Sequence, residues 1–260
     1  MLAAQILTDE QLAEIESDLK QQESDLRKSM IDGLKNEVIL AQFVFYSTLE
    51  GPCNVIDLNG IEQPFRNPIG APIYCYLQNE HVFLLKIYKQ AISEITAPEF
   101  DQTRGIKVLD EWEKTDGAEG GRHIFAAMLL PSLSRAWMME SRQEAMLRMM
   151  RIACAIERYR LKNHKLPASL EELAMPDMPL DPFNQHPFGY ECGELTFWKC
   201  HSWKMSPVKI ATATGYRLYS VGPDRKNDGG KLDNIDTGDI VVSVADPGTY
   251  VECTGSDPEE

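Results

Sequence analysis

The 260-residue sequence has no uninterrupted apolar run of about 18 residues, the length at which a helix becomes a candidate to cross a bilayer. Its opening segment, residues 1–7, also lacks the basic region and the long apolar region of a signal peptide. Both absences predict a chain that makes no membrane contact as given. They are equally compatible with an export signal or anchor that has been removed.

Basic charge is scarce. The sequence holds 26 Lys and Arg residues against 40 Asp and Glu residues, which gives a formal net charge of -14. Binding to nucleic acid requires clustered Lys and Arg to neutralise phosphates, so the composition argues against a nucleic-acid partner. It also disfavours adsorption to anionic lipid. An acidic surface suits solubility and divalent cations.

The usual catalytic and metal motifs are missing. The six cysteines form no C-x-x-C pair, no Gly-x-Ser-x-Gly elbow is present, and no glycine-rich loop carries a Walker lysine. The histidines, including His164, His186 and His201, have no ligand-like spacing on one element. Cys192 and Cys200 flank a turn-like stretch where a cross-strand disulfide is geometrically possible. The sequence therefore predicts a protein that is not an enzyme.

Helical signals fill the first half of the chain. Thr8 and Gln11 form a capping-box pattern that begins an amphipathic helix. Gly33 predicts a break before a second helix, and the prolines of residues 52–78 predict a long ordered loop. A further helix is expected over Asn79–Thr96. We expect a helical region over residues 1–120.

The second half changes from helix to strand. Residues 131–163 are helical in pattern almost without interruption, and a short helix capped by Ser169 follows. The expected strands are 188–192 and 196–200, which would form a hairpin, then 216–221 and 239–244. The sequence predicts an α+β fold whose second domain, residues 121–260, packs the long helix on a small antiparallel sheet.

A loop rich in Asp, Asn and Gly joins the last two expected strands. Its oxygen-bearing side chains are suited to a hard cation, and its glycines let the backbone curl around one. The candidate ligands are Asp224, Asn227, Asp228 and Asp239, with Asp233 and Asp236 as further oxygens. The alternative is a surface loop whose Asx side chains bind their own backbone.

Seven segments in a fixed order carry a family resemblance: Ala155–Asn163, Leu166-Pro167, Ser169–Leu173, Leu180–Phe183, Pro187–Tyr190, Tyr219–Asp224 and Gly238–Ile240. In this order and spacing they resemble the globular part of the major pseudopilins of type II secretion, the G-type subunits. The resemblance covers roughly residues 140–245. It implies a calcium ion in the acidic loop, with Asp224 and Asp239 at the acidic positions of that family. It also implies a place on the periplasmic or extracellular face of a bacterial cell envelope.

The chain departs from that family in two places. Acidic helical sequence precedes the long helix where a pseudopilin has its anchor, and residues 199–213 form an insertion. The whole is similar to uncharacterised bacterial envelope proteins that combine an anchor, a helical region opening like Leu7–Leu12, and a pseudopilin-like end.

Two functions remain open from the sequence. The first is a non-enzymatic structural or protein-interaction protein of the envelope, with a protein partner or self-association and a calcium-stabilised end. The alternative is a hydrolase-like enzyme with its site between the helical region and the sheet.

Overall fold

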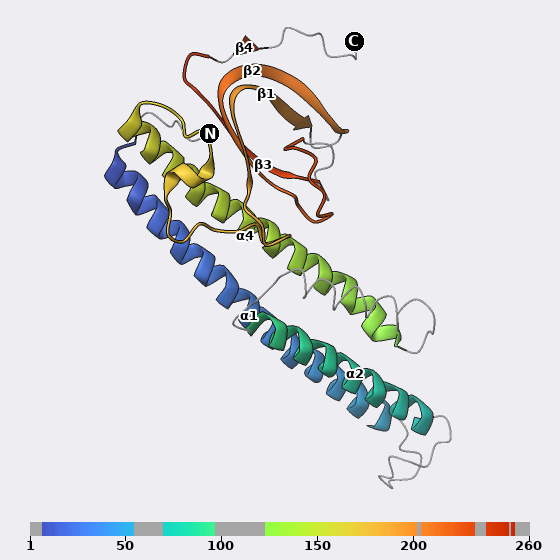
Figure 1. The fold of residues 1–260 in the computed structure, drawn as a ribbon. Helices are drawn as coiled ribbons and strands as arrows, with labels where there is room; N and C mark the ends of the chain where they lie inside the picture. The colour runs from blue at the N-terminus through green and yellow to red at the C-terminus, as the bar shows by residue number, and fades with distance from the viewer. Residues whose placement is uncertain are drawn as a thin grey trace. The chain divides into compact units, whose positions relative to one another are not determined.

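The computed structural model describes residues 7–54, 70–96, 123–201, 204–231, 238–249 and 251–252. Three long helices are followed by a short 3-10 helix and an antiparallel sheet (Figure 1), which confirms the α+β class. In chain order the elements are α1 (Asp9–Asn54), α2 (Gly70–Thr96), α4 (Ile124–Asn163), η2 (Leu170–Leu173), β1 (Gly189–His201), β2 (Lys204–Ser220), β3 (Ile240–Ala245) and β4 (Val251–Glu252).

The chain divides into two compact units. One consists of Met1–Leu26 together with Met139–Glu260, and the other of Arg27–Met138. This division differs from the sequence-based boundary at residue 120, because it falls inside helices α1 and α4 rather than in a linker. The predicted linker at 115–121 lies outside the described residues.

Helix α1 begins as predicted but continues past its predicted break. The backbone N–H of Thr8 donates to Gln11 Oε1 at 2.9 Å, and the N–H of Gln11 donates to Thr8 Oγ1 at 3.3 Å, so the capping box is confirmed. The break at Gly33 is wrong. A glycine costs a helix interior only about 1 kcal/mol relative to alanine, and the neighbouring Leu34 is buried in an apolar cluster that holds the helix together.

The predicted loop over residues 52–78 is also wrong at both of its ends. Helix α1 continues to Asn54, and α2 begins at Gly70. Pro72 lies in the first turn of α2, where a missing N–H breaks no helical hydrogen bond. The middle of this segment, residues 55–69, lies outside the described part.

The unit of Arg27–Met138 has its own core. Buried side chains from α1, α2 and the adjoining part of α4 pack together, and Trp137 is the largest of them. The members are Leu34, Leu77, Leu84, Ile87, Tyr88, Ala91 and Trp137.

Helix α4 begins at Ile124, before the predicted Pro131, and ends at Asn163 as predicted. His164 follows it with a φ of 57°, and its N–H donates to Arg160 O at 2.8 Å. This left-handed residue after the last turn closes the helix. Arg160 and Lys162 in that turn complement the negative end of the helix dipole.

The sheet has the order β1-β2-β3, with β4 pairing with β2 beyond the end of β3. The predicted strands 216–221 and 239–244 are confirmed within β2 and β3. The predicted hairpin is wrong, because 188–192 and 196–200 largely belong to one strand, β1, which pairs along β2. Gly193, with a φ of 121°, continues the strand instead of turning it.

This correction also removes the cross-strand geometry that made a Cys192–Cys200 disulfide possible. Cys192 is opposite Tyr216 and is a free, exposed thiol. Cys200 lies farther along the same strand, about 26 Å away at roughly 3.3 Å per residue. The described parts of the insertion, 199–201 and 204–213, form the end of β1 and the first part of β2.

A second core joins α4 to the sheet in the unit that contains Met139–Glu260. Met149, Ile152 and Ile156 of α4 are fully buried against Tyr216 and Leu218 of β2. The remaining buried members are Ala145, Ala153, Leu170, Phe183, Phe188, Val221, Ile240 and Val244. Burying a large apolar side chain stabilises by about 1.5–3 kcal/mol, so this cluster dominates the stability of the unit.

Candidate functional site

The acidic loop leaves β2 at Ser220 and returns at Ile240. Its described parts, 221–231 and 238–239, curl sharply. Gly222, Arg225, Gly229 and Gly230 all have φ between 60° and 71°. Only glycine takes this left-handed region without strain, so the two adjacent glycines supply most of the curl.

Asp239 organises the loop from within. It is buried, and its carboxylate accepts hydrogen bonds from the N–H of Gly230 at 2.7 Å and of Asp228 at 3.5 Å. Burial is the largest influence on its pKa and raises it, while these hydrogen bonds oppose the rise. The negative charges of Asp228 and Asp224 raise the pKa further. Asp228 and Asp224 therefore lie within electrostatic range of Asp239.

The side chains of Asp224 and Asn227 each accept a hydrogen bond from the backbone N–H two residues later in the chain. Asp224 Oδ1 accepts from Lys226 N at 3.0 Å, and Asn227 Oδ1 accepts from Gly229 N at 2.9 Å. These are Asx turns, the alternative that the sequence left open for this loop. The structure thus places Asp228 and Asp224 within electrostatic range of Asp239, while it commits one oxygen each of Asp224 and Asn227 to the loop itself.

A calcium ion fits part of this arrangement. The repulsion that Asp228 and Asp224 exert on Asp239 would be relieved by a cation, and carboxylate and amide oxygens are the ligands calcium prefers. Yet among the described residues no three His, Cys, Asp or Glu side chains are arranged to hold a metal ion. Asp233 and Asp236 lie outside the described residues.

Asp181 is the buried polar residue that sequence reasoning missed. Its carboxylate accepts from Phe183 N at 3.0 Å, Ser220 Oγ at 2.9 Å and Val221 N at 2.9 Å. Two backbone hydrogen bonds close the turn that carries Asp181: its N–H donates to His186 O, and the N–H of Gln185 donates to Asp181 O, both at 2.8 Å. One carboxylate therefore ties the turn before the sheet to the last residues of β2. The sequence signal was the Asp-Pro-Phe triplet, which predicts only a turn.

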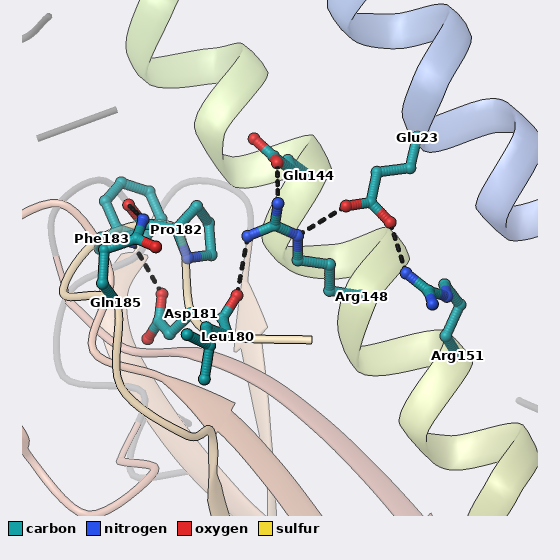
Figure 2. A network of polar contacts seen from close by, with 9 residues as sticks. All are labelled: Glu23, Glu144, Arg148, Arg151, Leu180, Asp181, Pro182, Phe183 and Gln185. Atoms are coloured by element: carbon teal, nitrogen blue, oxygen red, sulfur yellow. Dashed lines mark hydrogen bonds and ion pairs between the residues drawn. The ribbon is translucent and has the colours of Figure 1, made fainter. Parts of the chain in front are cut away.

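The pKa of Asp181 is raised by burial, and its three hydrogen bonds and Arg148 act in the opposite direction. Arg148 also contacts this turn directly, because its Nη1 donates to Leu180 O at 2.8 Å. Figure 2 shows Arg148 between the turn, Glu144 of the same helix and Glu23 of α1.

A second buried polar group lies between α4 and the sheet. Glu157 Oε2 is 2.6 Å from Arg160 Nη2, and Arg160 also forms an ion pair with Asp246, beyond the end of β3. Burial is the largest influence on the pKa of Glu157 and raises it, while the positive charge of Arg160 opposes this rise. Burial likewise raises the pKa of Cys154 to about 11, which makes this thiol unreactive at neutral pH.

An open groove of about 960 Å³ runs between the first turns of α1, the last turns of α4 and residues 172–177. Its acidic side chains all have partners. Asp9 and Glu16 bind Arg158, Asp177 binds Lys20, and Glu172 accepts from the phenol of Tyr159.

The other compact unit contains a histidine–carboxylate pair. His123 Nδ1 lies 3.1 Å from Glu80 Oε1, and the imidazole stacks on Phe83 with ring centroids 3.8 Å apart. Of the three histidines considered from the sequence, His164 and His186 are exposed, and nothing further is described for the His201 side chain.

No helix in the described ranges is both long enough and apolar enough to span a membrane. Comparison with protein-family models, curated proteins and solved structures gave no match.

Proposed function

We propose that this chain is a non-enzymatic structural or protein-interaction component of a bacterial cell envelope. In this proposal its C-terminal part is a pseudopilin-like module. Its partners are other proteins or further copies of itself, and it lies on the periplasmic or extracellular face.

The observation that carries the proposal is the way α4 packs on the sheet. The segments that carry the resemblance follow one another as the end of α4, η2, the Asp181 turn, β1, the end of β2, the acidic loop and β3. The buried cluster of Met149, Ile152, Ile156, Tyr216 and Leu218 joins the helix to the strands. A long helix on a small antiparallel sheet is the architecture expected from the resemblance.

The acidic loop supports a calcium ion as a structural cofactor of this module. In the proposal Asp239 and Asp228 are the central ligands, and Asp224 and Asn227 complete the set. The support is the setting of Asp239, whose pKa is raised by burial and, to a smaller extent, by the negative charges of Asp228 and Asp224, while its hydrogen bonds from Gly230 and Asp228 lower it. A cation there would stabilise a loop whose curvature depends on adjacent left-handed glycines.

The hydrolase alternative receives less support. General acid–base catalysis by carboxylates needs at least one that is placed to contact a substrate proton. The groove's four acidic side chains instead bind Arg158, Lys20 and Tyr159. The buried carboxylate of Asp181 is occupied by three hydrogen bonds within the fold.

The proposed location is tested in the cells that carry the gene. Spheroplasts are treated with a protease that does not cross the inner membrane, and the protein is followed by an antibody against residues 139–249. We expect digestion in intact spheroplasts while a cytoplasmic marker survives. Survival of both until the spheroplasts are lysed would contradict the proposed location.

A further inference from the structure

The first part of α1, residues 9–26, makes a set of ion pairs with α4 and with Asp177. We name this segment the strap. It carries seven acidic residues (Asp9, Glu10, Glu14, Glu16, Asp18, Glu23 and Asp25) and one basic residue, Lys20. Within it Leu12 is the one fully buried large apolar side chain, and Leu12 belongs to neither apolar core.

The polar contacts described between the strap and the rest of its unit are ion pairs, which accompany an apolar side of buried Leu12 and half-buried Ile15, Leu19 and Leu26. Three arginines, Arg148, Arg151 and Arg158, lie along α4 at spacings that place them on one side of the helix. Arg158 binds Asp9 at 2.8 Å and Glu16 at 3.1 Å, and Lys20 of the strap binds Asp177 at 3.2 Å. These pairs are largely exposed, and exposed ion pairs contribute little to stability.

Glu23 is the exception. Its two oxygens bind different arginines, Arg148 Nε at 2.7 Å and Arg151 Nη1 at 2.6 Å (Figure 2). The Glu23 and Arg151 side chains are only 18% and 8% exposed. Hydrogen bonds between charged groups in such surroundings are the strong ones, so Glu23 fixes the strap to α4.

From this geometry we infer that the strap can leave α4 while the rest of its unit stays folded. The vacated face of α4 then binds another acidic amphipathic helix that presents carboxylates at the strap's spacing. The unit keeps its fold because the cluster of α4 and the sheet contains no strap residue. The face accepts an acidic helix because Arg151 and Arg158 would otherwise lose the carboxylates they bind, and Arg148 would keep only Glu144 and Leu180 O.

Hydrogen exchange on the full chain tests the release. An isolated amphipathic helix is marginal in water, so amides of residues 10–26 should exchange faster once the strap is free. We expect Glu23→Gln to raise their exchange by about tenfold or more, since the lost charged hydrogen bonds are each worth about a tenfold change. Amides of residues 150–156 and 215–220 should be unchanged.

Asp18→Asn is the matched control, because Asp18 is an exposed acid of the same helix with no described ion pair. It should leave all exchange rates as they are. Faster exchange of 150–156 and 215–220 together with the strap in Glu23→Gln would overturn the inference, as would no change in the strap.

The docking of a second helix is tested with a fluorescent peptide of residues 7–26. The Glu23→Gln chain should bind this peptide about tenfold more tightly than the wild-type chain does, because its own strap leaves the face open more often. A peptide that itself carries Glu23→Gln should bind that chain less tightly than the wild-type peptide. Equal affinity of the two chains, equal affinity of the two peptides, or no binding at millimolar peptide would each overturn the docking.

Discussion

Asp181 is expected to be the most important single polar side chain of the module that contains the sheet. Replacing it with alanine leaves three groups without an acceptor: the N–H groups of Phe183 and Val221 and the hydroxyl of Ser220. All three residues are buried, so water cannot easily replace the carboxylate.

The magnitude follows from these contacts. Hydrogen bonds to charged groups contribute about 1.5–3 kcal/mol each, and losses within one network are not additive. Burial of the carboxylate opposes the gain, as its raised pKa indicates. We expect Asp181→Ala to lower the free energy of unfolding by about 3–5 kcal/mol, and Asp181→Asn by about 2–3 kcal/mol because an amide nitrogen cannot accept from Val221 N–H.

The assay is urea unfolding of the full chain, monitored by the hydrogen exchange of residues 215–221. This segment reports the stability of the unit that contains the sheet. Asp224→Ala is the control, because it removes one hydrogen bond at an exposed Asx turn and should cost less than about 1 kcal/mol. Equal losses in Asp181→Ala and Asp224→Ala would refute the structural role given to Asp181.

Three further predictions concern the same unit. Gly229→Ala should destabilise the folded state by about 1 kcal/mol, from its left-handed φ alone. Gly230→Ala should destabilise it by about 2–4 kcal/mol, because the new Cβ would also lie 2.7 Å from Arg217 Cδ. Thermal melting of both variants measures the difference, and equal losses of stability would contradict the steric clash at Gly230. Since the pKa of Glu157 is raised on folding, its contribution to stability is present below its unfolded pKa and is lost as pH rises through its folded pKa. Glu157→Gln should therefore gain stability relative to the wild type as pH rises from about 4 to 7. Urea unfolding midpoints of both proteins at the two pH values measure this change, and a loss of relative stability in Glu157→Gln would contradict it. In the folded chain a thiol reagent at neutral pH should modify the exposed Cys192 and leave Cys154 intact, as peptide mass mapping would report; modification of Cys154 before unfolding would contradict its burial.

Local signals in the sequence were sufficient for the beginning of α1, the end of α4 and two strands. The capping box of Thr8 and Gln11, the end of α4 at Asn163 and the strands 216–221 and 239–244 depend on residues close together in the chain, so their patterns are readable. The α+β class follows from the order of these elements.

Long-range packing decided the features that the sequence did not predict. Gly33 remains helical because Leu34 is buried beside it, and Gly189–His201 form one strand because β2 is long enough to pair with nearly all of it. Both readings rested on glycines as turn signals, and a glycine permits a turn without requiring one.

The candidate site was readable in composition but not in arrangement. The pattern of Asp, Asn and Gly indicated oxygen ligands, yet it could not show that Asp224 and Asn227 bind their own backbone. Asp181 was missed because its partners, Ser220 and Val221, lie about forty residues away in the sequence. Glu23 was missed for the same reason, since its two arginines belong to another helix.

Thermal melting of the purified chain in millimolar calcium and then in excess chelator tests the proposed calcium-stabilised module most directly. A ligand present at a hundred times its Kd stabilises the folded state by about 2.7 kcal/mol, which corresponds to a rise in Tm of roughly 5–10 °C for a unit of this size. We expect such a rise with calcium, its loss in chelator, and its absence in Asp239→Asn. An unchanged midpoint in the wild-type chain would contradict the calcium site and remove the support that the acidic loop gives to the proposed module.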